Sequence, residues 1–538
     1  MRREQDVASS PLPESATPPH ASSRRRWWLR AVWLLGFLSP ILWLLWRLYG
    51  PPERIVVSYE TTRITSPLKA DGRSVDYGAA LRKQFQSSKA VSLAETPVGK
   101  LLRHRAKERL SSSDAVPTFY DPDLFLSQEH IVSQQDRDRF RDRIHGQLPI
   151  VADSDRELAD IIESNIPWYN AVMQQPAVET TLSLDALDLE DEANSNPLLT
   201  DPLYCRDATN ACKELARRMR QLARYEFGRG RSEKSIDAIE WNLHWNRSSS
   251  IRTAPIMDHV AFVSADTTLQ EALITLLLNQ KWIDEPQLAR ICTWNIHQDL
   301  HLTWAASWDT FERYGLLNTI QIAQVDFDES GLMILLFFDE NQKQQWIRNS
   351  IRWNDVLRAQ NQHFDRITEA MKIRNFPERI RQLENQREQF RDEFDVERYS
   401  DTNYDLKHLV YSDWTKWFQA ACFWHSDFSS SVGAVPAADL NRQRVLNLIT
   451  RTVAWRQRLG TYPESLKQLL TLSDFPQPPE HLTIDAFTLE PFRYLRTDDG
   501  FVISSAGPNM VHEIKWDPPD IYEIRRLDDR FWSWPQLN

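Results

Sequence analysis

The sequence predicts a mainly α-helical protein with a single N-terminal transmembrane helix, an ectodomain of helical hairpins and a small α+β module at its C-terminus. Three observations support this fold class: a long apolar stretch near the N-terminus, apolar residues at helical spacing through most of the remaining chain, and a low glycine content. Glycine occurs 14 times in 538 residues, well below the usual share of about 7 %. We expect a disordered cytoplasmic tail over residues 1–26, a transmembrane helix over 27–49, the helical ectodomain over 50–436 and the α+β module over 437–538.

The apolar stretch Trp27–Tyr49 has the length and the flanks of a membrane-spanning helix. A helix needs about 20 apolar residues to cross the hydrocarbon core, and this stretch supplies them directly behind Arg24, Arg25 and Arg26. The preceding residues, 4–23, are rich in serine and proline and predict disorder. Positive charge concentrates on the cytoplasmic side of membrane helices. We therefore expect a single-pass protein of the inner membrane, with its N-terminus in the cytoplasm and its ectodomain in the periplasm.

Two other interpretations of the apolar stretch are a cleaved signal peptide and a buried core helix. A signal peptide ends at small residues, whereas the exit here reads WRLYGPPER, with bulky side chains followed by prolines. Aromatic residues lie at both ends of the stretch, as in the aromatic belts of membrane helices. These features favour an uncleaved signal anchor.

The composition of the chain is that of a folded acidic protein. Its formal net charge is −11 and its pI is near 5.7, so no general affinity for nucleic acid is expected. Four cysteines, Cys205, Cys212, Cys292 and Cys422, are too few for a disulfide framework. If Cys205 and Cys212 share a helix, their Cα atoms lie about 10 Å apart, beyond the reach of a disulfide. Buried free thiols are favoured, and a bridge across a loop is the alternative.

Apolar stripes predict a succession of helices joined by short turns. One helix is expected to end near Gly228, and another to begin at Asp284. The stripe within residues 268–282 is the clearest, and Thr268 and Glu271 have the spacing of a capping box at its start. Antiparallel helices with such short connections build hairpins or an α-solenoid. The segment FGRGRSEKSIDAIEWNL resembles a tetratricopeptide hairpin.

Two other segments carry specific expectations. A turn is expected at Asp71–Gly72, shortly after the anchor, and a helix follows it. Residues 339–398 are polar with sparse apolar positions, which predicts two surface helices separated near Pro377. A coiled-coil face for a partner is the alternative for this region.

The C-terminal part changes from helical to mixed structure. A helix over residues 437–459 is followed by two alternating segments, which begin at Phe492 and Phe501 and flank the turn residues 497–500, and this pattern predicts a β-hairpin. With the segments GTYPESLKQLL and IDAFTLEPF, this tail resembles the end of type II secretion pseudopilins, the G-like proteins. The matching residues are Tyr462, Pro463, Leu466, Leu469, Asp485, Phe487, Tyr494, Gly500, Ser505, Gly507, Pro508 and Asn509.

This resemblance implies a small α+β module, and the chain departs from the pseudopilin pattern in two places. Pseudopilins carry their hydrophobic helix at the extreme N-terminus, whereas the anchor here precedes the tail by about 400 residues. The acidic pair that often follows GPN, associated with calcium in related tails, is replaced by Met510, Val511, His512 and Glu513. The anchor, the SPLKADGRSVDY segment, the helical middle and the tail together resemble uncharacterised single-pass membrane proteins of planctomycete bacteria. That resemblance implies no known activity.

The sequence lacks the motifs GxSxG, GxxxxGK[ST], GxGxxG, HExxH and CxxC. His297 and His301 are four residues apart, which would place two metal ligands on one helix face, but no third ligand is identified. Ordinary histidines are therefore favoured there. Asp498 and Asp499 are interpreted as turn residues.

One segment partly resembles the opening of a calcium-binding loop. Asp326, Asp328, Ser330 and Gly331 follow that pattern, yet Phe337 stands where the bidentate glutamate belongs. A plain turn is favoured instead. We therefore predict no catalytic, cofactor-binding or metal-binding residue.

These observations favour a membrane-anchored extracytoplasmic scaffold that binds other proteins, with no enzymatic activity. One alternative is an envelope enzyme whose active site carries no recognisable motif. Another is a component that docks to a secretion apparatus through the pseudopilin-like tail. The membrane and protein partners are the expected contacts, and nucleic acid is not.

Overall fold

The computed structural model describes most of the chain after the apolar stretch. The described residues are 50–86, 91–92, 150, 156–174, 180–181, 202–250, 256–278, 283–294, 300–325, 347–394, 413–426, 429–473, 475–497, 500–510 and 530–534, with single positions between Trp28 and Trp46. Within these residues, no helix is both long enough and apolar enough to cross a membrane. Most of Trp27–Tyr49 lies outside them.

The described part of the chain is mainly helical, as the sequence predicts. Its α-helices are α2 (Tyr59–Thr62), α3 (Tyr77–Gln86), α6 (Arg156–Met173), α8 (Pro202–Gly228), α9 (Ser232–Ser250), α10 (Ile256–Leu278), α11 (Glu285–Cys292), α12 (Leu300–Ser307), α13 (Arg313–Val325), α15 (Trp353–Met371), α16 (Phe376–Phe394), α19 (Trp414–Ser426) and α20 (Ser429–Leu459). A π-helix, η5, covers Trp308–Glu312, and a 3-10 helix, η8, covers Leu466–Thr471. The strands are β1 (Val91–Ser92), β2 (Thr180–Thr181), β3 (Arg493–Arg496), β4 (Phe501–Ser505) and β5 (Arg530–Trp534).

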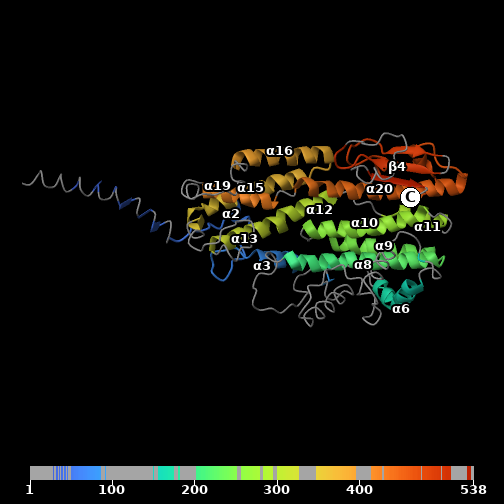
Figure 1. Ribbon diagram of the computed structural model, residues 1–538, viewed down its shortest axis with the longest axis horizontal. Coiled ribbons are helices and arrows are strands. Elements are labelled where there is room, and N and C mark those ends of the chain that lie inside the picture. Colours follow the sequence, from blue (N-terminus) through green and yellow to red (C-terminus); the bar gives the residue numbers. More distant parts are fainter. Residues whose placement is uncertain are drawn as a thin grey trace, which may run out of the picture.

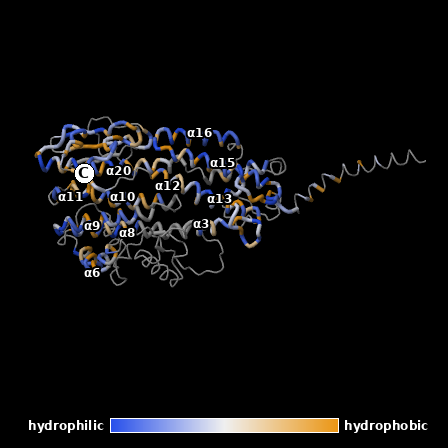
Figure 2. The backbone as a smooth tube through the Cα atoms, turned by 180° about the vertical axis from the view of Figure 1, so that it is seen from behind, coloured by the Kyte–Doolittle hydropathy of each residue, from blue (hydrophilic) through white to orange (hydrophobic). Residues whose placement is uncertain are grey.

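The helices lie side by side along the long axis of the molecule (Figure 1). Helices α8, α9 and α10 pack against one another, and α20 lies between α10 and α16. The antiparallel sheet β3-β4-β5 lies at one end, near α11. Helices α2, α13 and α19 lie at the other end, from which the described positions between Trp28 and Trp46 extend away (Figure 1). Helix α16, at the edge of the stack, is mostly hydrophilic (Figure 2).

Two large apolar cores hold these helices together. The first joins α6, α8, α9, α10 and α11 to the second half of α20 and to the β3-β4 hairpin. The second joins α12, α13, α15, α16 and α19. In it, Trp353 packs edge-on against Phe418 with ring centroids 5.1 Å apart, a geometry worth about 1 kcal/mol beyond the apolar area that it buries. Helix α20 bridges both cores, because Ala437 belongs to the second and Val445 to the first.

Several local predictions are confirmed. Helix α8 ends at Gly228, and α11 begins behind Asp284, whose side chain accepts a hydrogen bond from Gln287 N–H in a capping box. The turn at Asp71–Gly72 is present, with Gly72 at a φ of 64°. Strands β3 and β4 pair as an antiparallel hairpin, in which Tyr494 lies opposite Ile503.

Two predictions are wrong. The stripe in residues 268–282 does not start a helix, because α10 already begins at Ile256 and Thr268 lies inside it. The Thr268 hydroxyl donates to the Ser264 carbonyl one turn earlier, so it caps nothing.

The helices on either side of Pro377 are present, but α15 is a core helix rather than a surface helix. It buries, among others, Trp353, Val356, Leu357, Phe364, Ile367 and Met371.

The domain boundary expected between residues 436 and 437 falls inside α20 and stays a prediction. Residues on both sides of it share the second core, where the rings of Phe376 and Phe487 lie 4.9 Å apart.

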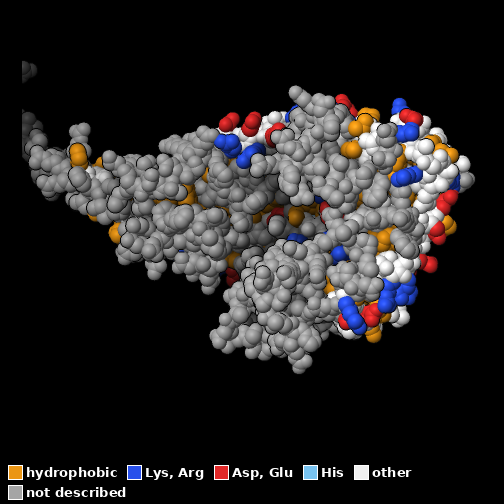
Figure 3. Space-filling view, turned by 45° about the vertical axis from the view of Figure 1, so that its right-hand side comes forward, with side chains coloured by type: hydrophobic (Ala, Val, Ile, Leu, Met, Phe, Trp, Pro, Cys, Tyr) orange, Lys and Arg blue, Asp and Glu red, His pale blue; other side chains and the backbone are white. Residues whose placement is uncertain are grey.

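On the face shown in Figure 3, the described basic and acidic side chains are interspersed rather than gathered by sign.

Candidate functional site

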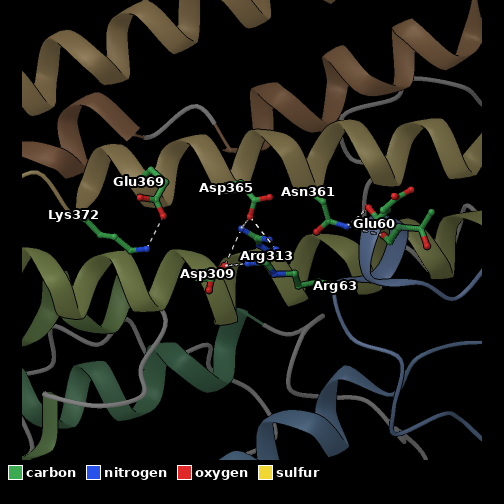
Figure 4. Close-up of polar contacts among 9 residues, drawn as sticks. Glu60, Arg63, Asp309, Arg313, Asn361, Asp365, Glu369 and Lys372 are labelled. Carbon is green, nitrogen blue, oxygen red and sulfur yellow. Dashed lines mark hydrogen bonds and ion pairs between the residues drawn. The ribbon is translucent and has the colours of Figure 1, made fainter.

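A π-helical turn marks the candidate site. Helix α12, the turn η5 and helix α13 follow one another directly along the chain. Single π-turns within α-helices are rare and occur frequently at functional sites, because they change which side chains face a neighbouring helix. Here Ser307 precedes the turn, Asp309 lies in it and Arg313 follows it. Asp309 and Arg313 lie on the side that meets α2 and α15 (Figure 4).

Two arginines and two aspartates form a charged cluster at this turn (Figure 4). Arg313 is fully buried, and its Nη2 lies 2.9 Å from Asp309 Oδ1 and 2.8 Å from Asp365 Oδ1. Arg63 approaches the same carboxylates, at 3.4 Å from Asp309 and 3.2 Å from Asp365. The side chains of Asp309 and Asp365 are 36% and 48% exposed, so water still hydrates them. The buried Arg313 cation, in contrast, depends on these two carboxylates for compensation.

The short helix α2 positions Arg63 for this contact. Ser58 and Thr61 form a capping box at its start. Asn361 of α15 donates from Nδ2 to the carbonyls of Glu60 and Thr61 at 3.0 and 2.9 Å, which satisfies groups that the helix end leaves without a helical partner. Arg63 follows with a φ of 62°, a conformation that is uncommon for a residue other than glycine. Such strained residues concentrate at functional sites.

The segment that contains α2, together with the residues before it, lies along α15. We call this segment, residues 50–64, the strap. Asn354 contacts the strap with both amide atoms. Its Nδ2 donates to the Arg54 carbonyl at 2.9 Å, and its Oδ1 accepts from the Val56 N–H at 2.8 Å. The other amide contacts of this kind join Asn349 to Gly50, Gln324 to Glu53, and Asn361 to Glu60 and Thr61. We call the helices that follow the strap the body. Side-chain amides of the body thus make the hydrogen bonds to the strap backbone that a neighbouring strand would make in a sheet.

A buried histidine and serine lie on the other side of the π-helical turn. His259 Nε2 lies 2.7 Å from Ser307 Oγ, a distance that suits a base and a nucleophile. Burial lowers the pKa of His259 to about 4, so the ring is neutral at pH 7. Its Nδ1 makes no hydrogen bond within the described part of the chain, whereas a catalytic dyad needs a third group to orient the base. The pair is therefore best explained as a core contact beside Trp304.

The metal-site candidates from the sequence are only partly covered by the structure. His301 lies in α12 with its side chain buried, while His297 and the segment 326–337 lie outside the described residues. The expected turn residues Asp498 and Asp499 also lie outside them. Among the residues that are described, no group of three or more His, Cys, Asp and Glu side chains could hold a metal ion.

The cysteines follow the prediction where their side chains are described. Cys292 and Cys422 are buried free thiols. Burial raises the pKa of Cys292 to about 12 and that of Cys422 well above its usual range, which keeps both in the unreactive thiol form. Cys205 and Cys212 both fall within α8, so their helical spacing of about 10 Å excludes a bridge between them.

Several residues that carry the pseudopilin resemblance make buried hydrogen bonds in the C-terminal part, some of them around the carboxylate of Asp485. Asp485 accepts hydrogen bonds from Asn441 of α20 and from two backbone N–H groups. Ser505 accepts from Asn441 at 3.1 Å and from the Gly507 N–H at 3.3 Å. Tyr494 donates to the Pro463 carbonyl at 2.8 Å. These residues stabilise the C-terminal part through internal hydrogen bonds, and no bound ligand is needed to account for them.

Sequence reasoning missed the charged cluster and the strap. Two signals could have indicated them: Asp309 and Arg313 have the spacing of an ion pair on one helix face, and Asn354 and Asn361 lie seven residues apart, also on one face. Neither signal identifies Arg63 as the partner. No protein-family model, no curated protein and no solved structure matches the chain.

Proposed function

We propose that the protein is a membrane-anchored, extracytoplasmic helical scaffold that binds other proteins. The observation that carries this proposal is the strap: the chain that follows the apolar stretch is bound to the helical body by side-chain amides and by Arg63. Such a connection fixes how the body of a membrane-anchored scaffold is oriented relative to its anchor.

The anchor is supported by the exposure of apolar side chains in the stretch. Trp28, Trp33 and Trp46 are 66%, 69% and 61% exposed. Burying an exposed aromatic side chain is worth about 2 kcal/mol, so a bilayer is the environment that suits several of them together. The arginines before the stretch favour a cytoplasmic N-terminus. The body then lies outside the cytoplasm.

The long helical body supplies the binding surface of the proposed scaffold. Helices α8 and α9 form a hairpin closed at Gly230, and α10 packs against both. This arrangement supports a tetratricopeptide-like use of helical hairpins, in which stacked helices present an extended face to a partner. The α20–β3–β4 region supports the pseudopilin-like interpretation of the C-terminal module, through the Asp485 contacts.

Topology is tested by fusing the first 20 and the first 60 residues to a reporter that is active only in the periplasm. We expect activity for the longer fusion and none for the shorter one. Activity of the shorter fusion would overturn the proposed orientation.

Binding is tested by chemical crosslinking in intact membranes, followed by purification of the full-length protein. We expect a stoichiometric protein partner that remains when residues 1–20 are removed and is lost when the body is removed. Recovery of no partner, together with turnover of an envelope substrate, would contradict the scaffold and favour an enzyme.

A second candidate function is docking to a secretion apparatus through the C-terminal module. The hydrogen bonds that Asp485 accepts from Phe487 and Ala506, within the pseudopilin-like tail, favour it. In the same crosslinking experiment, secretion components joined to residues 460–510 would support this function, and crosslinks confined to α8, α9 and α10 would contradict it.

A further inference from the structure

We infer that the strap is a releasable latch: when closed it fixes the orientation of the body relative to the anchor, and it opens at Arg63 while the body stays folded. The orientation rests on the proposed membrane anchor, whereas the latch itself does not.

The closed strap is held along its whole length. Its backbone is bonded to the amides of Asn349, Asn354 and Asn361, which come from α15 and from the residues just before it. Three of its apolar side chains, Ile55, Val57 and Ile64, pack against the second core, while Val56 and Tyr59 are exposed. The Tyr77 hydroxyl donates to the Thr62 carbonyl at 2.8 Å. A segment held at this many points does not swing freely, so the anchor and the body move together.

The strap can nevertheless leave without disturbing the helices beneath it. Most of its bonds to α13 and α15 are made by side chains of those helices. The exception is the backbone N–H of Asn354 in the first turn of α15, which donates to Glu53 Oε2 at 3.2 Å and has no partner within the helix. Release therefore breaks no backbone–backbone hydrogen bond inside either helix. This distinguishes the strap from a strand in a sheet, whose removal would leave a row of unpaired backbone groups.

The charge arrangement makes Arg63 the point at which the latch opens. Arg313 contacts both Asp309 and Asp365, so each carboxylate keeps one cation when Arg63 departs. Both carboxylates are partly exposed and can be hydrated, and Arg63 itself is 21% exposed. Partly exposed ion pairs contribute little to stability and weaken in salt. Release also frees Arg63 from its positive φ of 62°.

A closed latch has a geometric consequence for the proposed scaffold. The strap holds the end that carries α2, α13 and α15 next to the anchor, and the end that carries α11 and the β3-β4 hairpin lies far from it (Figure 1). Closed, the body therefore presents that far end away from the membrane. Open, the body is tethered by a longer chain and can tilt.

Hydrogen exchange measured by mass spectrometry tests the latch on the full-length protein in lipid nanodiscs. In the Arg63→Gln variant, we expect peptides from residues 50–64 to exchange up to about fivefold faster than in the wild type. Peptides from α13 and α15 should change by less than about twofold. The matched control is Arg358→Gln, at a more exposed arginine of α15 that pairs with Asp355 outside the cluster, and it should leave the strap unchanged.

Unchanged exchange of the strap in Arg63→Gln would overturn the latch, and so would an equal increase throughout α13 and α15. If the variant does not fold, the wild type supplies the test. Raising NaCl from about 50 mM to about 1 M screens the partly exposed pairs, so the strap should then exchange faster while α8 does not. A salt-independent strap would overturn the latch. Failure of the chain to enter nanodiscs would instead contradict the anchor, and is recognised separately by its recovery in the lipid-free fraction.

Discussion

The Asp485 carboxylate accepts a hydrogen bond from the Asn441 side-chain amide at 2.7 Å, inside a fully buried contact between the C-terminal loop and α20. The same carboxylate accepts from the backbone N–H groups of Phe487 and Ala506 at 2.8 and 2.9 Å. Asn441 completes the contact, because its Oδ1 accepts from the Ala486 N–H at 2.7 Å. One acidic side chain therefore joins three chain segments that are separate in the sequence.

Replacing Asp485 by alanine should destabilise the protein by about 3 kcal/mol, because three buried donors would lose their acceptor. The free energy of unfolding in urea measures the effect, and exchange of peptides from residues 480–510 shows where it acts. The control is Glu480→Ala at a 75% exposed side chain, which should change stability by less than about 0.5 kcal/mol. Equal stability of the two variants would contradict the fastening role of Asp485.

The sequence predicts the ends of some helices well and those of others poorly, for a physical reason. The start of α11 is visible because Asp284 and Gln287 cap it. Helix α10 packs against α8, α9 and α20 and is apolar on several sides, so its periodicity does not show where it begins. The apparent cap at Thr268 lies mid-helix, where a threonine hydroxyl can bond back to the preceding turn.

The charged cluster could not be predicted, because its members are far apart in the sequence. Arg63 and Asp309 are separated by 246 residues, and Arg313 and Asp365 by 52. Composition and periodicity report only on local neighbours. The buried state of Arg313 is equally invisible, since arginine is normally exposed. The hairpin of β3 and β4, in contrast, was predictable because its pairing is local.

Arg313 and Arg63 share partners but should respond differently to substitution. Arg313→Ala removes a fully buried cation, leaves a cavity and leaves Asp309 and Asp365 with Arg63 alone. We expect a loss of about 3 kcal/mol or more in the free energy of unfolding. Arg63→Gln should cost about 1 kcal/mol or less. Urea denaturation of both variants in the same buffer makes the comparison, and equal losses would contradict the different roles assigned to the two arginines.

Acid should destabilise the protein through His259. Burial lowers the pKa of this histidine from 6.5 to about 4, so between these values the unfolded chain binds a proton that the folded chain does not. Stability is therefore fully present above pH 6.5 and falls as the pH approaches 4. The loss from this group amounts to about 3 kcal/mol.

The variant His259→Gln cannot take up that proton and can keep a hydrogen bond to Ser307. Its free energy of unfolding should fall less steeply between pH 6.5 and 4 than that of the wild type. His481→Gln, at a 54% exposed histidine, is the control and should keep the wild-type slope. Parallel pH profiles for the wild type and His259→Gln would show that His259 does not contribute to the acid sensitivity.

Two glycines on long helices should respond oppositely to alanine. A Cβ at Gly228 would lie 2.1 Å from the Ile150 carbonyl oxygen, and that backbone is held by its own hydrogen bond to Arg224. Gly228→Ala should therefore cost about 2 kcal/mol, as overpacking does. At Gly433 the nearest atom is the Leu383 Cδ1 methyl at 3.0 Å, which can rotate away, and alanine favours the helix by about 1 kcal/mol. Gly433→Ala should therefore unfold at a urea concentration equal to or above that of the wild type, whereas Gly228→Ala should unfold clearly below it. A Gly228→Ala variant as stable as the wild type would mean that residue 150 does not pack against the end of α8.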